Sequence, residues 1–254
     1  MNFLSLGFIP AAVGSSDTHG RTEPAGLPRT LVRVKDDSAA ALRTGVADEV
    51  IATLTAQGGA LRDLYSTSGP VLRLWAGSGA RRVGIGGTTQ PEPGDPGNPE
   101  QTDGVLHLEV EALCTEWAPI DTIEVFANST FPSPETGPTP PAMVPALCFT
   151  SRAAPSERCR KAAVFGALTI ETVDRPRGGR YLRARLVVEA PVAKLLRGSA
   201  NVPGARGKDL WLLARAFGDH SLFPVVPGGV RPGPAGSGTD LDSLISGTPV
   251  TTSG

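Results

Sequence analysis

The chain has 254 residues, 40% of them apolar, and its 24 Lys and Arg residues nearly balance 25 Asp and Glu residues. This length and apolar content allow one large domain or two small ones with a buried core. Arginine is spread along the sequence without forming a basic stripe, and no apolar run reaches the ~20 residues of a membrane span, so the composition argues against a nucleic-acid-binding protein and against a transmembrane segment.

The N-terminal segment combines an apolar run with a candidate metal-binding pair. Residues 8–13 (FIPAAV) predict a buried strand; a secretory signal is the alternative, but the basic residues that precede such a signal are missing. Asp17 and His19 follow, and residues two apart project to the same side of an extended chain. A carboxylate and an imidazole arranged in this way suit zinc, manganese or iron. Taken alone, the pair favours a polar turn in which Asp17 caps the loop and His19 is exposed.

Three further elements are predicted in the first third of the chain. Residues 30–34 form a short strand, and residues 68–75 form another. Between them a helix begins near Asp48, where negative charge is favourable, and ends at Gly58. Residues 81–103 are rich in Gly and Pro, which leaves little room for regular structure, so a linker and a domain boundary are expected there.

Residues 104–227 are predicted to form a β-rich module. Apolar and polar residues alternate in several short segments, which is typical of half-buried strands. The predicted strands are residues 105–112, 121–128, 163–170, 180–188 and 210–217. Short strands separated by turns favour an antiparallel sandwich, with a proline-rich exposed loop at 131–145. Residues 228–254 are mostly Gly, Pro, Ser and Thr and are predicted to be a flexible tail.

The other residues with ligating or nucleophilic chemistry form no recognised site. Cys114, Cys148 and Cys159 fit no zinc motif, and their odd number does not close a disulfide framework. Cys148 and Cys159 could pair across the intervening loop, but two free thiols are the favoured interpretation. His107 is predicted to be a solvated residue on the polar face of a strand, and His220 a turn residue. No serine can be assigned as a nucleophile, because a Gly-x-Ser-x-Gly motif is absent.

Five segments of the sequence together resemble a known enzyme family. They are AVGSSDTH (12–19), AGLPRTLVRV (25–34), STSGP (66–70), WAPIDTIEVFAN (117–128) and DLWLLARAFGD (209–219). In this order they resemble the end of a PHP (polymerase and histidinol phosphatase) domain and the β-rich module that follows it in the CehA/McbA-like branch. PHP proteins are metal-dependent hydrolases, and the resemblance covers most of residues 1–224.

The resemblance implies a distorted (β/α) barrel that holds two or three metal ions through an early His-x-His pair, intermediate ligands and a late Asp-x-His pair. Only the late pair has a counterpart, so Asp17 and His19 would be ligands for zinc, manganese or iron. The expected fold is therefore mainly β: a remnant of a PHP (β/α) barrel with a trailing strand in residues 1–80, followed by an antiparallel β-sandwich-like C-terminal module. The chain would then correspond to the C-terminal part of a larger enzyme.

Two functions are compatible with this reading of the sequence. The first is a truncated, phosphoesterase-like PHP hydrolase that is inactive alone, because a catalytic metal needs about three protein ligands and an open position for water. The divalent metal would bind weakly or not at all. If the missing part of the enzyme were supplied, the expected substrate would be a small molecule or a phosphoester. The alternative is a non-catalytic β-sandwich binding or accessory module. An N-terminal part separated from its barrel would leave open strand edges, which favour aggregation or a partner chain that covers them.

Overall fold

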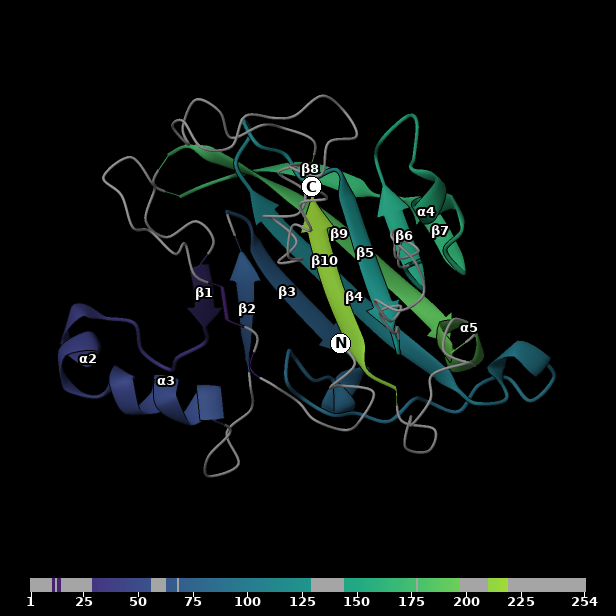
Figure 1. Ribbon diagram of the computed structural model, residues 1–254, viewed down its shortest axis with the longest axis horizontal. Helices are drawn as coiled ribbons and strands as arrows, with labels where there is room; N and C mark the ends of the chain where they lie inside the picture. Colours follow the sequence, from purple (N-terminus) through teal and green to yellow (C-terminus); the bar gives the residue numbers. More distant parts are fainter. Residues whose placement is uncertain are drawn as a thin grey trace, which may run out of the picture.

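Two four-stranded sheets and a two-stranded ribbon form the part of the chain that the structure, a computed structural model, describes (Figure 1). That part comprises residues 11, 13–14, 29–55, 63–67, 69–128, 144–176, 178–196 and 210–218. Within it the fold is mainly β with antiparallel sheets, as the alternating pattern predicts, and no barrel is closed. The predicted strand at 8–13, the proline-rich loop and the tail lie largely or wholly outside the described residues.

The first large sheet, here called the β4 sheet, is antiparallel throughout and has the strand order β3-β4-β9-β8. Its strands are β3 (Val71–Ala76), β4 (Val105–Cys114), β9 (Arg180–Pro191) and β8 (Thr169–Asp174). The long central pair β4 and β9 is in register over ten residues, from the pair Val105 and Pro191 to the pair Cys114 and Leu182. This register gives both strands one apolar face.

The second large sheet, the β5 sheet, has the order β10-β5-β6-β7. Its strands are β10 (Leu212–Phe217), β5 (Thr122–Ala127), β6 (Leu147–Thr150) and β7 (Val164–Ala167). The pairs β10–β5 and β5–β6 are antiparallel, but β6 and β7 are parallel. Parallel neighbours need a crossover connection. Residues 151–163 provide it and include the one-turn helix α4 (Glu157–Arg160).

The two sheets pack face to face around one core, the arrangement of a β-sandwich (Figure 1). Alternation along β4 directs Leu108 and Val110 inward, and alternation along β5 directs Ile123 and Val125 inward. All four belong to the same buried cluster. Burying such side chains contributes roughly 1.5–3 kcal/mol each, so this cluster is the main source of stability in the described part.

The ribbon precedes the sandwich and consists of β1 (Arg29–Val32) and β2 (Leu64–Thr67), which pair antiparallel. Two helices connect its strands, α2 (Ala39–Thr44) and α3 (Val46–Thr55). The helix predicted from Asp48 corresponds to α3, whereas α2 was not anticipated because its alanine-rich sequence has no apolar period. A tight turn, in which the Thr67 hydroxyl donates to the carbonyl oxygen of Pro70 at 2.7 Å, leads from β2 into β3.

Two segments differ from the sequence-based expectation. The single strand predicted at 163–170 is wrong: the chain forms β7 in one sheet and β8 in the other, because the buried side chain of Leu168 turns into the core between them. The segment 81–103 follows the helical turn η2 (Gly79–Arg81) and contains short hydrogen-bonded pieces, including the helical turn η3 (Pro99–Gln101). Glu92 forms an isolated bridge with Val105, so this segment is fastened to the β4 sheet.

Two adjacent residues of β9 allow a test of which side chains point into the core and which point to solvent. Leu186 is 2% exposed and Val187 is 64% exposed. Leu186→Ala is expected to lower the free energy of unfolding by about 2–5 kcal/mol, since it leaves a cavity in the core. Val187→Ala, the matched control, is expected to change it by less than about 0.5 kcal/mol. Urea denaturation measures both, and equal losses would contradict the register of β9.

Candidate functional site

The metal-ligand pair predicted from the sequence lies outside the described residues, as does His220. The structure does describe Gly14, three residues before Asp17. Its amide donates to the hydroxyl of Thr30 in β1 at 2.8 Å, and that hydroxyl donates to the carbonyl oxygen of Gly14 at 3.1 Å. Ser66 of β2 lies so close to Gly14 that a side chain there would have no room. The chain is therefore fastened to the ribbon just before the predicted ligands.

Among the described residues, no group of three or more His, Cys, Asp or Glu side chains is arranged to hold a metal ion. His107 illustrates why. Its Nε2 lies 3.3 Å from Oε2 of Glu92, and its Nδ1 lies 3.4 Å from Oε1 of Glu189. The two carboxylates thus bind opposite sides of the ring and do not converge on one point. The Ser78 hydroxyl beside Glu92 donates to that carboxylate and lowers its pKa.

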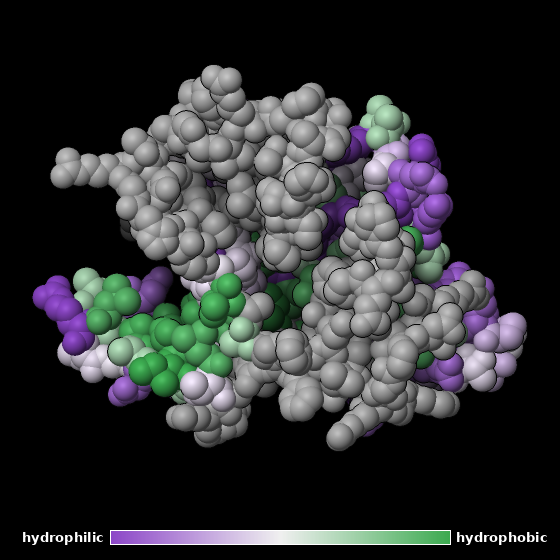
Figure 2. Space-filling model, in the orientation of Figure 1, coloured by the Kyte–Doolittle hydropathy of each residue, from purple (hydrophilic) through white to green (hydrophobic). Residues whose placement is uncertain are grey.

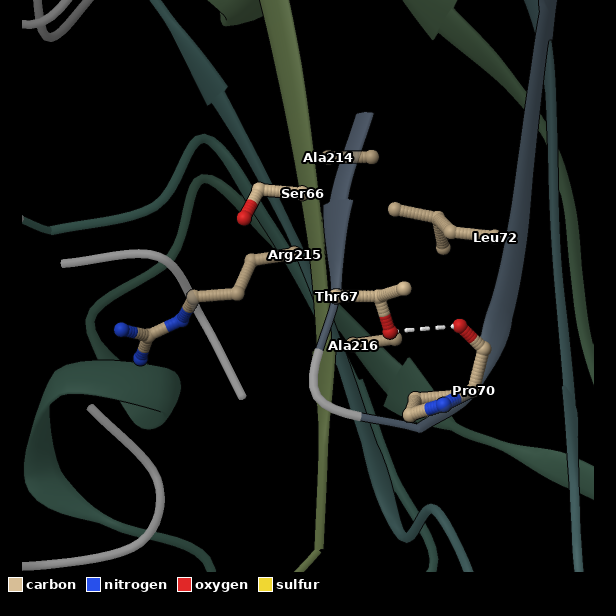
Figure 3. A pocket seen from close by; sticks show the side chains of 7 residues that line it. All are labelled: Ser66, Thr67, Pro70, Leu72, Ala214, Arg215 and Ala216. Atoms are coloured by element: carbon tan, nitrogen blue, oxygen red, sulfur yellow. Dashed lines mark hydrogen bonds between the residues drawn. The ribbon is translucent and has the colours of Figure 1, made fainter. Parts of the chain in front are cut away.

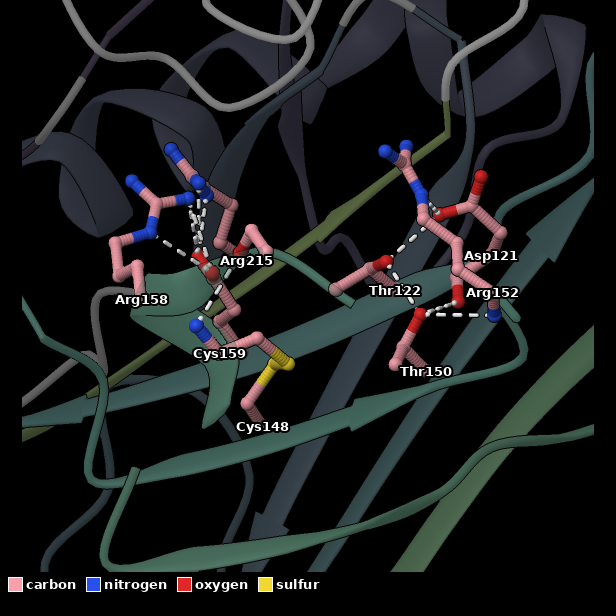
Figure 4. Close-up of polar contacts among 10 residues, drawn as sticks. Asp121, Thr122, Cys148, Thr150, Arg152, Arg158, Cys159 and Arg215 are labelled. Carbon is pink, nitrogen blue, oxygen red and sulfur yellow. Dashed lines mark hydrogen bonds and ion pairs between the residues drawn. A yellow bond between two sulfur atoms is a disulfide. The ribbon is translucent and has the colours of Figure 1, made fainter. Parts of the chain in front are cut away.

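A buried carboxylate with two arginine partners is the most unusual charged group in the described part. Glu124 has no exposed surface. Its Oε1 accepts from Nε of Arg158 at 3.2 Å and lies 3.0 Å from Nη2 of the same residue. Its Oε2 accepts from Nη2 of Arg158 at 3.2 Å and from Nε of Arg215 at 3.0 Å, and lies 2.8 Å from Nη2 of Arg215. These three residues are called the Glu124 cluster (Figure 4, left).

Strand alternation and register bring the Glu124 cluster together on the outer face of the β5 sheet. Glu124 lies between the inward-facing Ile123 and Val125, so its side chain points outward. Arg215 of β10 is its direct cross-strand neighbour. Arg158 comes from α4, whose first turn is capped by the Ser156 side chain, which accepts from the amide of Cys159 at 3.2 Å.

A disulfide joins α4 to the sheet next to this cluster. Cys148, the partner of Glu124 in the β5–β6 register, is bonded to Cys159, which follows Arg158 (Figure 4). The interpretation of Cys148 and Cys159 as two free thiols is therefore wrong. Cys114 is the free cysteine; it is buried, and burial raises the pKa of its thiol.

A second group of polar residues, around Asp121, lies beside the Glu124 cluster toward the end of the β5 sheet (Figure 4, right). Asp121 accepts from Nε of Arg152 and from the Thr122 hydroxyl, each at 2.7 Å. The guanidinium of Arg152 lies 5.7 Å from the ring centre of Phe217, and that of Arg215 lies 4.6 Å from the same ring. The Phe217 ring therefore contacts a cation of each group, an arrangement that stabilises both guanidiniums when water is excluded.

The chemistry of the Glu124 cluster is that of a clamp. A carboxylate offers about four lone-pair positions, and guanidinium donors occupy both oxygen atoms of Glu124. Both oxygen atoms of Glu124 are thus already bound to arginine side chains. The desolvation of the charge is offset only while both arginines stay in place. The cluster therefore fixes the positions of three elements, β5, β10 and α4, relative to one another.

A shallow recess lies at the other side of β10, where the sandwich meets the ribbon. Its cavity volume is about 30 Å³, far below that of typical ligand pockets, and it is open to solvent. Its lining comes from β2, β3 and β10 and the turn between the first two: Ser66, Thr67, Pro70, Leu72, Ala214, Arg215 and Ala216. Figure 3 shows the Arg215 guanidinium directed away from Leu72, and the Thr67 hydroxyl is bound to Pro70. The recess thus offers little that could orient a substrate.

The outer face of the β4 sheet carries several ion pairs. Glu109 of β4 binds Arg82, which follows η2, at 2.6 Å and Arg185 of β9 at 2.8 Å, and Glu111 of β4 binds Arg73 of β3 at 2.9 Å. The arginines are 43–52% exposed, so these pairs contribute little to stability, although Glu111 itself is buried. A different surface lies over α2 and α3, where Figure 2 shows apolar side chains and where Leu42 and Ile51 are more than half exposed.

Comparisons of the chain with protein-family models, with curated proteins and with solved structures give no significant match. Sequence reasoning missed the Glu124 cluster. The available signal was that Glu124 and Arg215 each stand as a single charge of opposite sign between apolar neighbours of a predicted strand.

Replacing the buried carboxylate tests whether the cluster is a clamp. Glu124→Gln keeps the shape but removes the charge that compensates two largely buried arginines, so the free energy of unfolding is expected to fall by about 3–5 kcal/mol. Glu171→Gln is the matched control, because Glu171 is nearly half exposed and pairs with Arg183. Its midpoint in urea denaturation is expected to stay unchanged within error. A Glu124→Gln variant as stable as this control would contradict the clamp.

Proposed function

We propose that the chain is the C-terminal part of a PHP-type metal-dependent hydrolase, and that its sandwich is a non-catalytic accessory module. The observation that carries the proposal is the contact of Gly14 with Thr30 and Ser66. It joins the segment that bears the Asp-x-His motif to the ribbon. The Asp-x-His motif and its flanking sequences are the basis for proposing the PHP family. The Gly14 contact offers a reason why a supporting module would follow the motif in the sequence.

The ribbon in turn continues directly into the sandwich. Thr67 and Pro70 are hydrogen-bonded in the turn between β2 and β3, and β3 is an edge strand of the β4 sheet. Gly14, which precedes the motif and is bound to β1, is therefore connected through the ribbon to a packed core by a short, hydrogen-bonded turn. This supports a module that holds the last ligands of a metal site in position.

The residues proposed to hold the metal are Asp17 and His19. A carboxylate and an imidazole fit zinc, manganese or iron, and such an ion would supply an acidified water for hydrolysis of a phosphoester or a similar small-molecule substrate. Two ligands from one short loop give weak binding. In the described part of the sandwich, the acidic side chains named above at its two outer faces bind arginine or histidine, which supports a non-catalytic role. The isolated chain is therefore proposed to be inactive.

Titration of the purified chain with Zn²⁺ tests the proposed ligands. We expect weak binding of at most one ion, lost in His19→Ala and in Asp17→Ala because each removes half of the ligand set. His220→Ala is the matched control, since it removes an imidazole outside the motif, and it should bind as the unchanged chain does. Equilibrium dialysis with metal analysis measures the bound ion, and bis(p-nitrophenyl) phosphate reports hydrolysis.

Two outcomes would contradict the proposal in different ways. Tight binding of one ion per chain together with rapid hydrolysis would show that the chain is an active enzyme by itself. Binding that is unaffected by His19→Ala, or no binding and no change of stability on chelation, would remove the metal-ligand assignment and favour the stand-alone binding module.

A further inference from the structure

We propose that the disulfide between Cys148 and Cys159 is a redox latch that holds Arg158 on the buried carboxylate of Glu124. The inference concerns the β5 sheet and is independent of the proposed metal site. It predicts that the outer face of this sheet has two states, one with α4 fastened and one with α4 released, and that the redox state of these two cysteines selects between them.

The position of the disulfide in the fold is the first argument. Cys148 is the neighbour of Glu124 in the β5–β6 register, and Cys159 is the neighbour of Arg158 in α4. One covalent bond therefore connects the strand beside the carboxylate with the helix that carries its guanidinium partner. The two cysteines are 11 positions apart in the sequence, one in β6 and one in the crossover between β6 and β7.

The weakness of α4 without the bond is the second argument. The helix has four residues, about one turn, and a helix this short is not stable by itself. Besides the disulfide, the ion pair between Arg158 and Glu124 is one of the described contacts that hold α4 to the sheet. The exposed neighbours Glu157 and Lys161 pair with each other and add nothing that holds α4 to the sheet.

The third argument is the burial of the two cysteines and of Glu124. Cys148 and Cys159 are 0% and 2% exposed, and Glu124 is 0% exposed. When α4 leaves, Glu124 keeps Arg215 but loses Arg158, so a charge buried with two partners is left with one of them. Because removing one partner of a buried pair is costly, the released state must be less stable than the fastened one.

Opening the latch is a two-electron reduction by a dithiol. The two thiols of dithiothreitol are oxidised to a cyclic disulfide, the bond between the cysteine sulfurs breaks, and each sulfur ends as a protonated thiol. Because both sulfurs are buried, the reductant reaches them only when residues 151–163 open locally. The latch therefore stays closed in an oxidising compartment and opens slowly in a reducing one.

Thermal unfolding of three forms with and without dithiothreitol tests the latch. The forms are the unchanged chain, Arg158→Ala, and the control Arg160→Ala, which removes an exposed arginine from the same helix. In the oxidised state Arg158→Ala is expected to lower the midpoint by about 4–10 °C and Arg160→Ala by less than about 2 °C. After reduction the two variants should differ by less than about 2 °C, because Arg158 is no longer held at Glu124.

If the midpoints of Arg158→Ala and Arg160→Ala differ by the same amount before and after reduction, the proposal is overturned, because Arg158 would then reach Glu124 without the disulfide. If Arg158→Ala does not fold, Arg158→Lys replaces it; it keeps the charge but not the two-pronged geometry, so the same loss of the difference is expected. Alkylation in denaturant gives a direct count. One reactive thiol, that of Cys114, is expected before reduction and three after it, and three before reduction would also overturn the proposal.

Discussion

A carboxylate with no exposed surface lies at the centre of the outer face of the β5 sheet, and the arrangement of that face depends on it. A buried charge of this kind is tolerated only if its partners remain in place. Arg215 and Arg158 meet this condition from opposite sides, one from the neighbouring strand and one from α4. The requirement of Glu124 for two cations therefore fixes where β10 and α4 must lie.

This constraint connects parts of the chain that are distant in sequence. The core between the sheets explains why strands β3 to β10 associate, but apolar contacts are non-directional and do not by themselves select one position for a one-turn helix. The ion pairs and the disulfide supply that selection. At the opposite side of β10 the ribbon meets the sandwich near Ser66, and the same ribbon holds Gly14 ahead of the proposed metal ligands. The ribbon thus connects the segment that contains Gly14 to the sandwich.

Alternation in the sequence predicted β4, β5, β9 and β10, because half-buried strands leave a period-two pattern, but it did not predict the short strand β6. The pattern placed Ile123 and Val125 on one face of the strand at 121–128, which is the core face, and thus Glu124 on the other face. Period two reports which residues share a face, not whether a second layer covers the polar face. The disulfide was missed because spacing alone does not show which cysteines meet, and the break at Leu168 because a change of sheet leaves no interruption in an apolar run. Asp17 and His19 lie outside the described residues and remain a prediction.

The coupling between Glu124 and Arg215 is the measurement that tests the account most directly. A double-mutant cycle with Glu124→Ala, Arg215→Ala and the double variant, followed by urea denaturation, isolates the free energy that the two side chains share. A carboxylate clamped by this arginine predicts a coupling of about 1–3 kcal/mol, with the double variant less destabilised than the sum of the single variants. Additivity within about 0.5 kcal/mol would contradict the clamp and with it the stated reason for the positions of β10 and α4.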